Sequence, residues 1–109
     1  MDYQVVWSPE ALNDIEEIAR YIERDSHFYA ASVVTRILQK TSLLKTFPFS
    51  VRVVPEEMDE NVREHFVSNY RIIYDIRDNF VYVLAVVHGK RMLYPEFEDR
   101  IKAENGSSR

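Results

Sequence analysis

Three β-rich runs separated by two-residue breaks constrain this chain more than any other feature. The runs and breaks are residues 62–67, 68–69, 70–77, 78–79 and 80–88. The breaks contain asparagine and aspartate, which tolerate the positive φ of two-residue hairpin loops, so the segment predicts a three-stranded antiparallel meander. With two residues in each loop, Val67 pairs with Tyr70 and Arg77 with Phe80, and the rest of the register follows by counting outward.

This register assigns every side chain of the meander to one of two faces. The face predicted to pack against helices carries Arg63, His65, Val67, Tyr70, Ile72, Tyr74, Ile76, Val81, Val83, Ala85 and Val87. The opposite face carries Val62, Glu64, Phe66, Arg71, Ile73, Asp75, Arg77, Phe80, Tyr82, Leu84, Val86 and His88. This second face mixes large apolar and ionic groups and is too apolar for a purely solvated surface, which predicts a site or a partner there.

The residues before the meander predict a short strand at 3–7 followed by two amphipathic helices. Ser8 supplies an N-cap for the first helix, which spans about fifteen residues by its apolar periodicity. Residues 25–26 interrupt the pattern and offer a cap for a second, longer helix, so the two helices form an antiparallel hairpin. Two prolines and an acidic cluster then predict a loop, with a short strand at 51–54.

Together these elements predict one α+β domain over residues 1–102, with residues 103–109 as a frayed tail. The N-terminal strand joins the three-stranded antiparallel meander in one sheet, and the helix hairpin covers it. A composition of 46% apolar and 29% charged residues suits one compact domain with a single core. Zero cysteines and two glycines exclude thiolate metal sites, cysteine nucleophiles and Gly-rich phosphate loops.

The charge balance also narrows the function. Fourteen Lys plus Arg against eighteen Asp plus Glu give a net charge of −4, which argues against a protein that mainly grips nucleic-acid phosphates. No apolar run approaches the ~20 residues of a membrane span, and no signal peptide is evident. We therefore expect a cytoplasmic protein without a membrane partner. The three histidines share no ligand spacing, so neither a metal nor another cofactor is predicted.

Short motifs follow one another in a recognisable order from residue 3 to residue 93. They are Ser8-Pro9-Glu10-Ala11 with Asp14, Ile15, Ile18 and Tyr21-Ile22; Leu44 with Phe47-Pro48; Val62-Arg63; Asn69-Tyr70-Arg71-Ile72-Ile73-Tyr74; and Val86-Val87-His88-Gly89-Lys90-Arg91. In this order they resemble the RelE/ParE superfamily of bacterial type II toxins. The helix opening and the ending at residues 88–91 are most similar to the ParE-like, plasmid-stabilisation branch.

The resemblance implies a small toxin that is neutralised by an antitoxin wrapped around it, with two kinds of target. ParE-like toxins inhibit DNA gyrase without known nuclease chemistry, whereas RelE-like toxins cleave messenger RNA inside the ribosome. RelE-like toxins carry lysines before the position of Arg63, where this chain has acidic residues that would repel RNA. We therefore predict a ParE-like, non-catalytic gyrase inhibitor. A ribosome-dependent endoribonuclease and a non-toxic interaction module remain as alternatives.

The ribonuclease alternative needs a base, an acid and cations that hold the developing charge on phosphate. Its candidate residues are Arg63, His88, Arg91 and Tyr94. Tyr94 matches the family's tail tyrosine only loosely, because Pro95 and an acidic run follow it. A structural role for His88 at a strand end is the competing interpretation.

Partner binding is predicted on the mixed face, because aromatic and arginine side chains together are typical interface anchors. The predicted contact residues are Phe66, Arg71, Tyr82, His88 and Arg91. A surface ion-pair ladder that includes Arg71 is the competing interpretation of the charges.

Two histidines and the sheet edges complete the predictions. His65 occupies a position that is usually aliphatic in the family, and we expect it to face the helices, partly buried and hydrogen-bonded there. His27 is expected in the turn between the helices. The outer strands of the meander have edges that natural proteins usually cover, so a homodimer is one expectation for the toxin alone.

Overall fold

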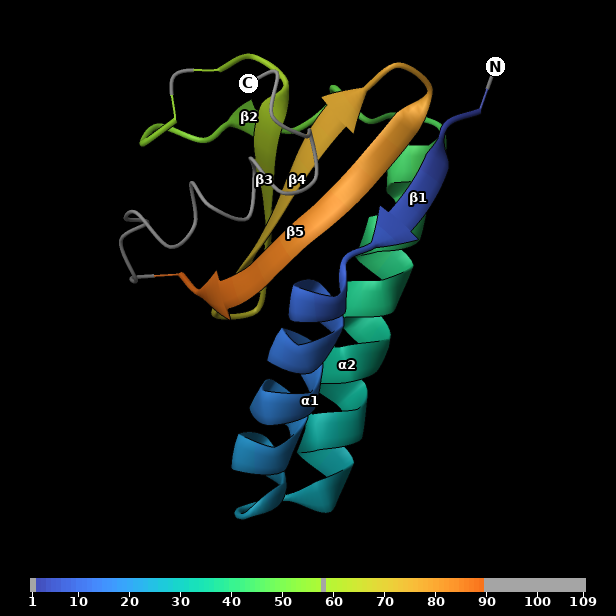
Figure 1. The fold of residues 1–109 in the computed structure, drawn as a ribbon. Coiled ribbons are helices and arrows are strands. Elements are labelled where there is room, and N and C mark those ends of the chain that lie inside the picture. Colours follow the sequence, from blue (N-terminus) through green and yellow to red (C-terminus); the bar gives the residue numbers. More distant parts are fainter. Residues whose placement is uncertain (1, 58, 90–109) are drawn as a thin grey trace.

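The computed structural model describes residues 2–57 and 59–89 and confirms the α+β class (Figure 1). In chain order the elements are β1 (Gln4–Trp7), α1 (Pro9–Glu23), α2 (His27–Ser42), the 3-10 helix η1 (Leu43–Lys45), β2 (Arg52–Val53), β3 (Val62–Val67), β4 (Tyr70–Arg77) and β5 (Phe80–His88). The predicted boundary at residue 102 and the tail at 103–109 lie outside the described residues.

The five strands form one mixed sheet in the order β1-β5-β4-β3-β2. The meander of β3, β4 and β5 is antiparallel, and Val67 pairs with Tyr70 as predicted. β1 pairs with β5 in parallel, from Gln4 opposite Phe80 onwards. β2 pairs with β3 in the antiparallel sense. The outer strands of the meander therefore have neighbours, contrary to the free edges on which the homodimer expectation was based.

Local signals explain where the helices and turns begin. The Ser8 and Ser26 hydroxyls accept hydrogen bonds from N–H groups of the first turns of α1 and α2, at 3.0 Å each, as N-cap residues do. His27 is thus the first residue of α2 and not a turn residue as predicted. Both hairpin loops have two residues, and the positive φ lies on the first of them, with 55° at Ser68 and 53° at Asp78.

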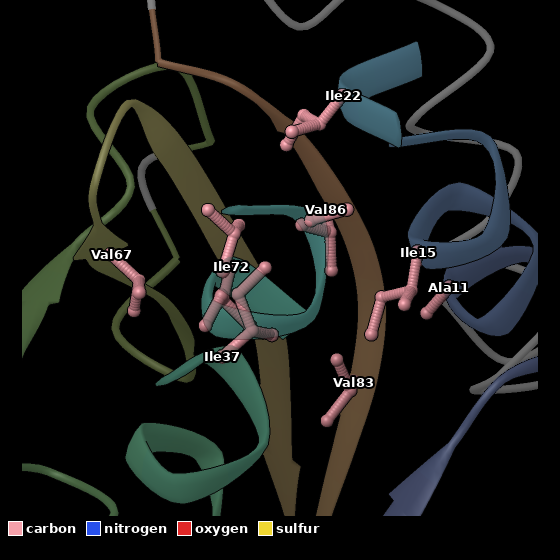
Figure 2. Packing of buried hydrophobic residues seen from close by; sticks show 10 residues of the cluster. Ala11, Ile15, Ile22, Ile37, Val67, Ile72, Val83 and Val86 are labelled. Carbon is pink, nitrogen blue, oxygen red and sulfur yellow. The ribbon is translucent and has the colours of Figure 1, made fainter. Parts of the chain in front are cut away.

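The helix hairpin covers one face of the sheet, and its turn projects beyond the sheet (Figure 1). We call this face the helix face and the other the outer face. Figure 2 shows apolar side chains of both helices gathered against those of the strands. The buried members of this core are Ala11, Ile15, Ile22, Ala30, Val33, Ile37, Val67, Ile72, Val83 and Val86. Burial of each large aliphatic side chain contributes about 1.5–3 kcal/mol.

A β-bulge in β5 overturns the predicted faces of the last residues of that strand. Ile73 pairs with Ala85 but Tyr74 pairs with Val83, so Leu84 is an extra residue between these two pairs. One extra residue reverses the alternation of side chains beyond it.

The consequence is an exchange of faces after the bulge. Val86 packs in the core on the helix face, whereas Ala85 and Val87 pack with Ile73 on the outer face. His88 pairs with Tyr70 and its ring meets the Tyr70 ring edge-on, with 5.9 Å between the centroids. The prediction that His88 shares a face with Arg71 is therefore wrong.

Candidate functional site

The outer face of the sheet is built around a buried arginine. Arg71 on β4 donates hydrogen bonds to both carboxylate oxygens of Glu56, at 3.0 Å each. It also donates to Oε1 of Glu64 on β3, from Nε at 2.9 Å and from Nη2 at 2.5 Å. Arg71 is 4% exposed and Glu64 is 1% exposed. The predicted contact residue Arg71 thus has little surface to offer a partner directly.

The charge of Arg71 is held by these carboxylates. Burial by itself lowers the pKa of Arg71, but the hydrogen bonds and charges of Glu56 and Glu64 outweigh it and raise the pKa above its usual value. Arg52 on β2 donates a further hydrogen bond to Glu64, and its guanidinium lies 5.3 Å from the centroid of the Phe66 ring. Glu64 is therefore shared by two arginines.

A second arginine–carboxylate contact lies further along the outer face. Arg77 donates to Asp75 at 3.3 Å and to Asp59 at 3.2 Å. Within the described residues these contacts join three arginines with four carboxylates, which are Arg52, Arg71, Arg77, Glu56, Asp59, Glu64 and Asp75. We call this group the outer-face ion cluster. It is an ion-pair ladder as the alternative interpretation predicted, but Arg71 and Asp75 are buried and not on the surface.

The loop before β3 covers the cluster. Val54 is fully buried and packs with Val62, Ile73 and Leu84 on the outer face. Glu56 lies two residues after Val54, and both of its carboxylate oxygens accept hydrogen bonds from Arg71. The acidic loop that the sequence places before Arg63 therefore neutralises arginines of its own chain.

The guanidinium of Arg63 also binds groups of the same chain. Its Nε donates to the carbonyl of Glu60 at 2.6 Å, and Nη1 donates to the carbonyls of Val51 at 2.8 Å and Phe49 at 3.4 Å. The guanidinium lies 5.0 Å from the centroid of the Phe49 ring. Arg63 thus holds the segment that connects η1 to β3.

Two of the four residues of the ribonuclease alternative, Arg63 and His88, lie apart in the described structure. Arg63 pairs with Tyr74, and His88 pairs with Tyr70. Tyr70 and Tyr74 are four residues apart on β4, which separates them by about 13 Å at the usual strand rise. Core residue Ile72 lies between them. Arg91 and Tyr94 lie outside the described residues.

His65 faces the helices as predicted, since it pairs with Ile72 on the helix face. Its Nδ1 is buried, and no hydrogen-bond partner exists for it among residues 2–57 and 59–89, contrary to the prediction of a satisfied imidazole. Burial first and the charge of Lys40 second lower the pKa of His65 below 6.5. A neutral imidazole is favoured there.

A crevice between α1 and the end of β5 is a feature that the sequence did not indicate. Its volume is about 320 Å³, and its walls are Asp14, Glu17, Ile18, Tyr21, Tyr70, Val86, Val87 and His88. We call it the α1–β5 crevice. Oδ2 of Asp14 accepts a hydrogen bond from the Val86 N–H at 3.0 Å, which fixes α1 against β5. The crevice depends on the bulge at Leu84, because the bulge turns Val86 and His88 towards α1.

The remaining predicted contact residues stay on the outer face. Phe66 is 46% exposed beside Arg52. Tyr82 is half-buried and stacks on Phe80, with ring centroids 5.6 Å apart and ring planes at 22°. Phe66 and Tyr82 therefore share a face with each other but not with His88, and their partner binding stays a prediction.

Residues 2–57 and 59–89 contain no group of three or more histidine, aspartate or glutamate side chains placed to hold a metal ion. No helix in that part is long and apolar enough to cross a membrane.

The hairpin on a mixed five-stranded sheet is the fold of small bacterial toxins. Solved structures that share it include the chromosomal ParDE toxin–antitoxin system from P. aeruginosa, the RelBE2 toxin–antitoxin complex from Mycobacterium tuberculosis, and a mutant of the E. coli toxin RelE in the free state. Their TM-scores are 0.67, 0.56 and 0.63, and their sequence identities are 16%, 23% and 16%. The alignments cover 79%, 81% and 95% of this chain, and 95%, 99% and 98% of the other chains.

The sequence itself then defines the family. A family model described as the ParE toxin of the type II toxin–antitoxin system parDE matches residues 5–93. The chain belongs to this family and is a type II toxin of the RelE/ParE superfamily. No curated protein gives a significant match.

Proposed function

We propose that this toxin inhibits DNA gyrase in the cytoplasm and is neutralised by a cognate antitoxin, as expected of the ParE-like, plasmid-stabilisation branch. The match of residues 5–93 to the ParE toxin family supports this assignment. The likeness to the ParDE system from P. aeruginosa supports the fold on which it rests.

The outer-face ion cluster favours gyrase over messenger RNA as the target. Cleavage of RNA requires cations that hold the charge developing on phosphate. Here Arg71 and Arg52 bind carboxylates of the same chain, and Arg63 binds backbone carbonyls. An RNA phosphate would have to displace these contacts and approach the acidic loop, which opposes binding.

A RelE-like ribonuclease is the second candidate function. The E. coli RelE likeness, which covers 95% of this chain, favours it at the level of the fold. Its weakness is geometric, because Arg63 and His88 are separated along β4 by core residue Ile72.

Antitoxin contacts are proposed on two separate surfaces. Phe66 and Tyr82 offer aromatic surface on the outer face, whereas His88 offers an exposed ring at the α1–β5 crevice. Arg71 supports the first surface from beneath through Glu64 and Glu56. An antitoxin segment that wraps around the sheet would contact both. Arg91 stays a predicted contact, and a homodimer of the toxin alone stays a proposal.

The purified chain distinguishes these functions in two parallel assays, one of DNA supercoiling by gyrase and one of messenger RNA integrity in a purified translation system. We expect loss of supercoiling and accumulation of gyrase–DNA cleavage complexes, with intact messenger. Cleaved messenger with normal supercoiling would contradict the proposal and establish the ribonuclease. Normal growth of a bacterial host during induced expression, with both assays negative, would instead identify a non-toxic interaction module.

A further inference from the structure

The α1–β5 crevice combines acidic and aromatic walls. Glu10, Asp14 and Glu17 follow one another at steps of four and three residues, so they lie on one face of α1. Asp14 and Glu17 line the crevice itself. Asp14 accepts a hydrogen bond from the Val86 N–H at 3.0 Å, and Glu17 accepts one from the Asn13 amide at 3.2 Å. The walls therefore attract a cation and repel a nucleic acid.

The aromatic walls add a preference for the type of cation. Tyr21 and Tyr70 line the crevice together with the His88 ring. Burial first, and then the neighbouring Tyr29 and Tyr21, raise the pKa of Tyr70, which keeps its phenol neutral. Aromatic faces bind guanidinium groups by cation–π attraction and by stacking of the planar group.

The chain itself shows that Tyr21 accepts such a group. The guanidinium of Arg24, one turn along α1, lies 5.9 Å from the centroid of the Tyr21 ring. Tyr21 is nevertheless 66% exposed, so its ring has surface left for a second ligand. Arg24 is then a competitor whose removal favours an incoming cation.

We propose that the α1–β5 crevice binds an arginine side chain of the antitoxin, with its guanidinium between the Glu17 and Asp14 carboxylates and the rings of Tyr21 and Tyr70. The identity of the partner rests on the proposed function. The choice of a protein segment rests on charge complementarity, since the crevice walls supply carboxylates and aromatic faces.

The test uses NMR amide shifts of the full-length chain and a small probe, N-acetyl-arginine-N-methylamide. The matched neutral probe is the corresponding citrulline derivative, which has the same length and no charge. We expect saturable shifts at Ile18, Tyr21 and Val86 with the arginine probe, and much smaller shifts with the citrulline probe. Equal shifts with both probes, shifts confined to other residues, or no shifts would each overturn the proposal.

Exposed variants locate the binding without disturbing the core. Glu17→Gln and Tyr21→Leu should each weaken binding of the arginine probe about two- to fivefold, the size expected for one exposed cation contact. The matched controls are Glu16→Gln and Phe28→Leu, which change exposed residues outside the crevice walls and should leave binding unchanged. Arg24→Ala should strengthen binding because it removes the competitor. Weaker binding after Arg24→Ala would contradict the site.

One further variant distinguishes the antitoxin from the chain itself. If the arginine probe binds only after Arg91→Ala, the crevice takes an arginine of its own chain and the proposal is wrong. Unchanged binding in Arg91→Ala supports an external ligand. Because no measurement here contains gyrase or ribosomes, failure of the crevice proposal leaves the proposed function standing. Failure of gyrase inhibition likewise leaves the crevice result intact.

Discussion

The two faces of the sheet are stabilised in different ways. On the helix face, Ile72 and Val83 pack against aliphatic side chains of both helices in an apolar core. On the outer face, Glu64 and Arg71 are equally buried, but they are held by a network of charge-assisted hydrogen bonds beside a smaller apolar cluster. An ionic pattern on alternate strand positions therefore does not by itself indicate a solvated or a substrate-binding face.

The largest expected effect comes from breaking the outer-face ion cluster. Glu64→Leu removes the carboxylate shared by Arg71 and Arg52 and should lower the free energy of unfolding by about 3–5 kcal/mol, because the buried Arg71 guanidinium loses one of its two carboxylate partners. The double variant Glu64→Leu with Arg71→Met should recover most of this loss. Urea unfolding measures both, with Glu60→Gln as an exposed control. A double variant no more stable than the single one would show that the unpaired Arg71 charge is not the cause of the loss.

A slightly smaller effect is expected on the helix face. Ile37 is fully buried between α2 and the sheet. Ile37→Ala should lower the free energy of unfolding by about 3 kcal/mol, through lost burial and the remaining cavity. Leu38→Ala, on an exposed position of the same helix, is the matched control and should change it little. Similar losses in both variants would contradict the assignment of the helix face.

The N-cap of α1 links the two faces. Its loss should lower the free energy of unfolding by less than either of the two preceding changes. The Ser8 hydroxyl accepts from the Ala11 N–H at 3.0 Å and donates to the carbonyl of the bulge residue Leu84 at 3.4 Å. Ser8→Ala should cost about 1–2 kcal/mol in urea unfolding. Ser26→Ala removes a cap without a contact to the bulge and should cost about 1 kcal/mol. A larger loss in Ser26→Ala would show that the contact to Leu84 adds nothing.

The smallest effect concerns His65, a polar side chain on the helix face. Its folded pKa lies below 6.5, so near that pH the unfolded chain binds more protons than the folded one. Stability should therefore be complete above pH 6.5 and fall as the pH drops from there towards the folded pKa. Thermal unfolding across this range should show a flatter dependence in His65→Leu. An equally steep dependence in that variant would assign the effect to other groups.

Local chemistry explains how much of the fold could be predicted from the sequence. The cap at Ser8 and the two-residue loops at 68–69 and 78–79 act within a few residues, and they define helix and strand bounds that the structure confirms. The bulge at Leu84 has no such signal, because no glycine or proline marks it. Its position depends on how β5 packs against β4 and α1.

The site was less predictable for the same reason. Phe66 and Arg71 were placed on the correct face, but the burial of Arg71 depends on Glu56, fifteen residues away on a loop. The crevice residues Asp14 and His88 are more distant still in the sequence. Contacts of this range follow from tertiary packing and not from local periodicity.

The central claim is that carboxylates of the chain itself neutralise its outer-face arginines. Fluorescence anisotropy of a labelled single-stranded RNA, titrated with the full-length chain at about 50 mM and about 200 mM salt, tests this claim most directly. We predict no saturable binding at either salt concentration. Tight binding at low salt that is lost at high salt, and that Arg52→Ala or Arg77→Ala weakens, would show arginines available to phosphate and would contradict the account.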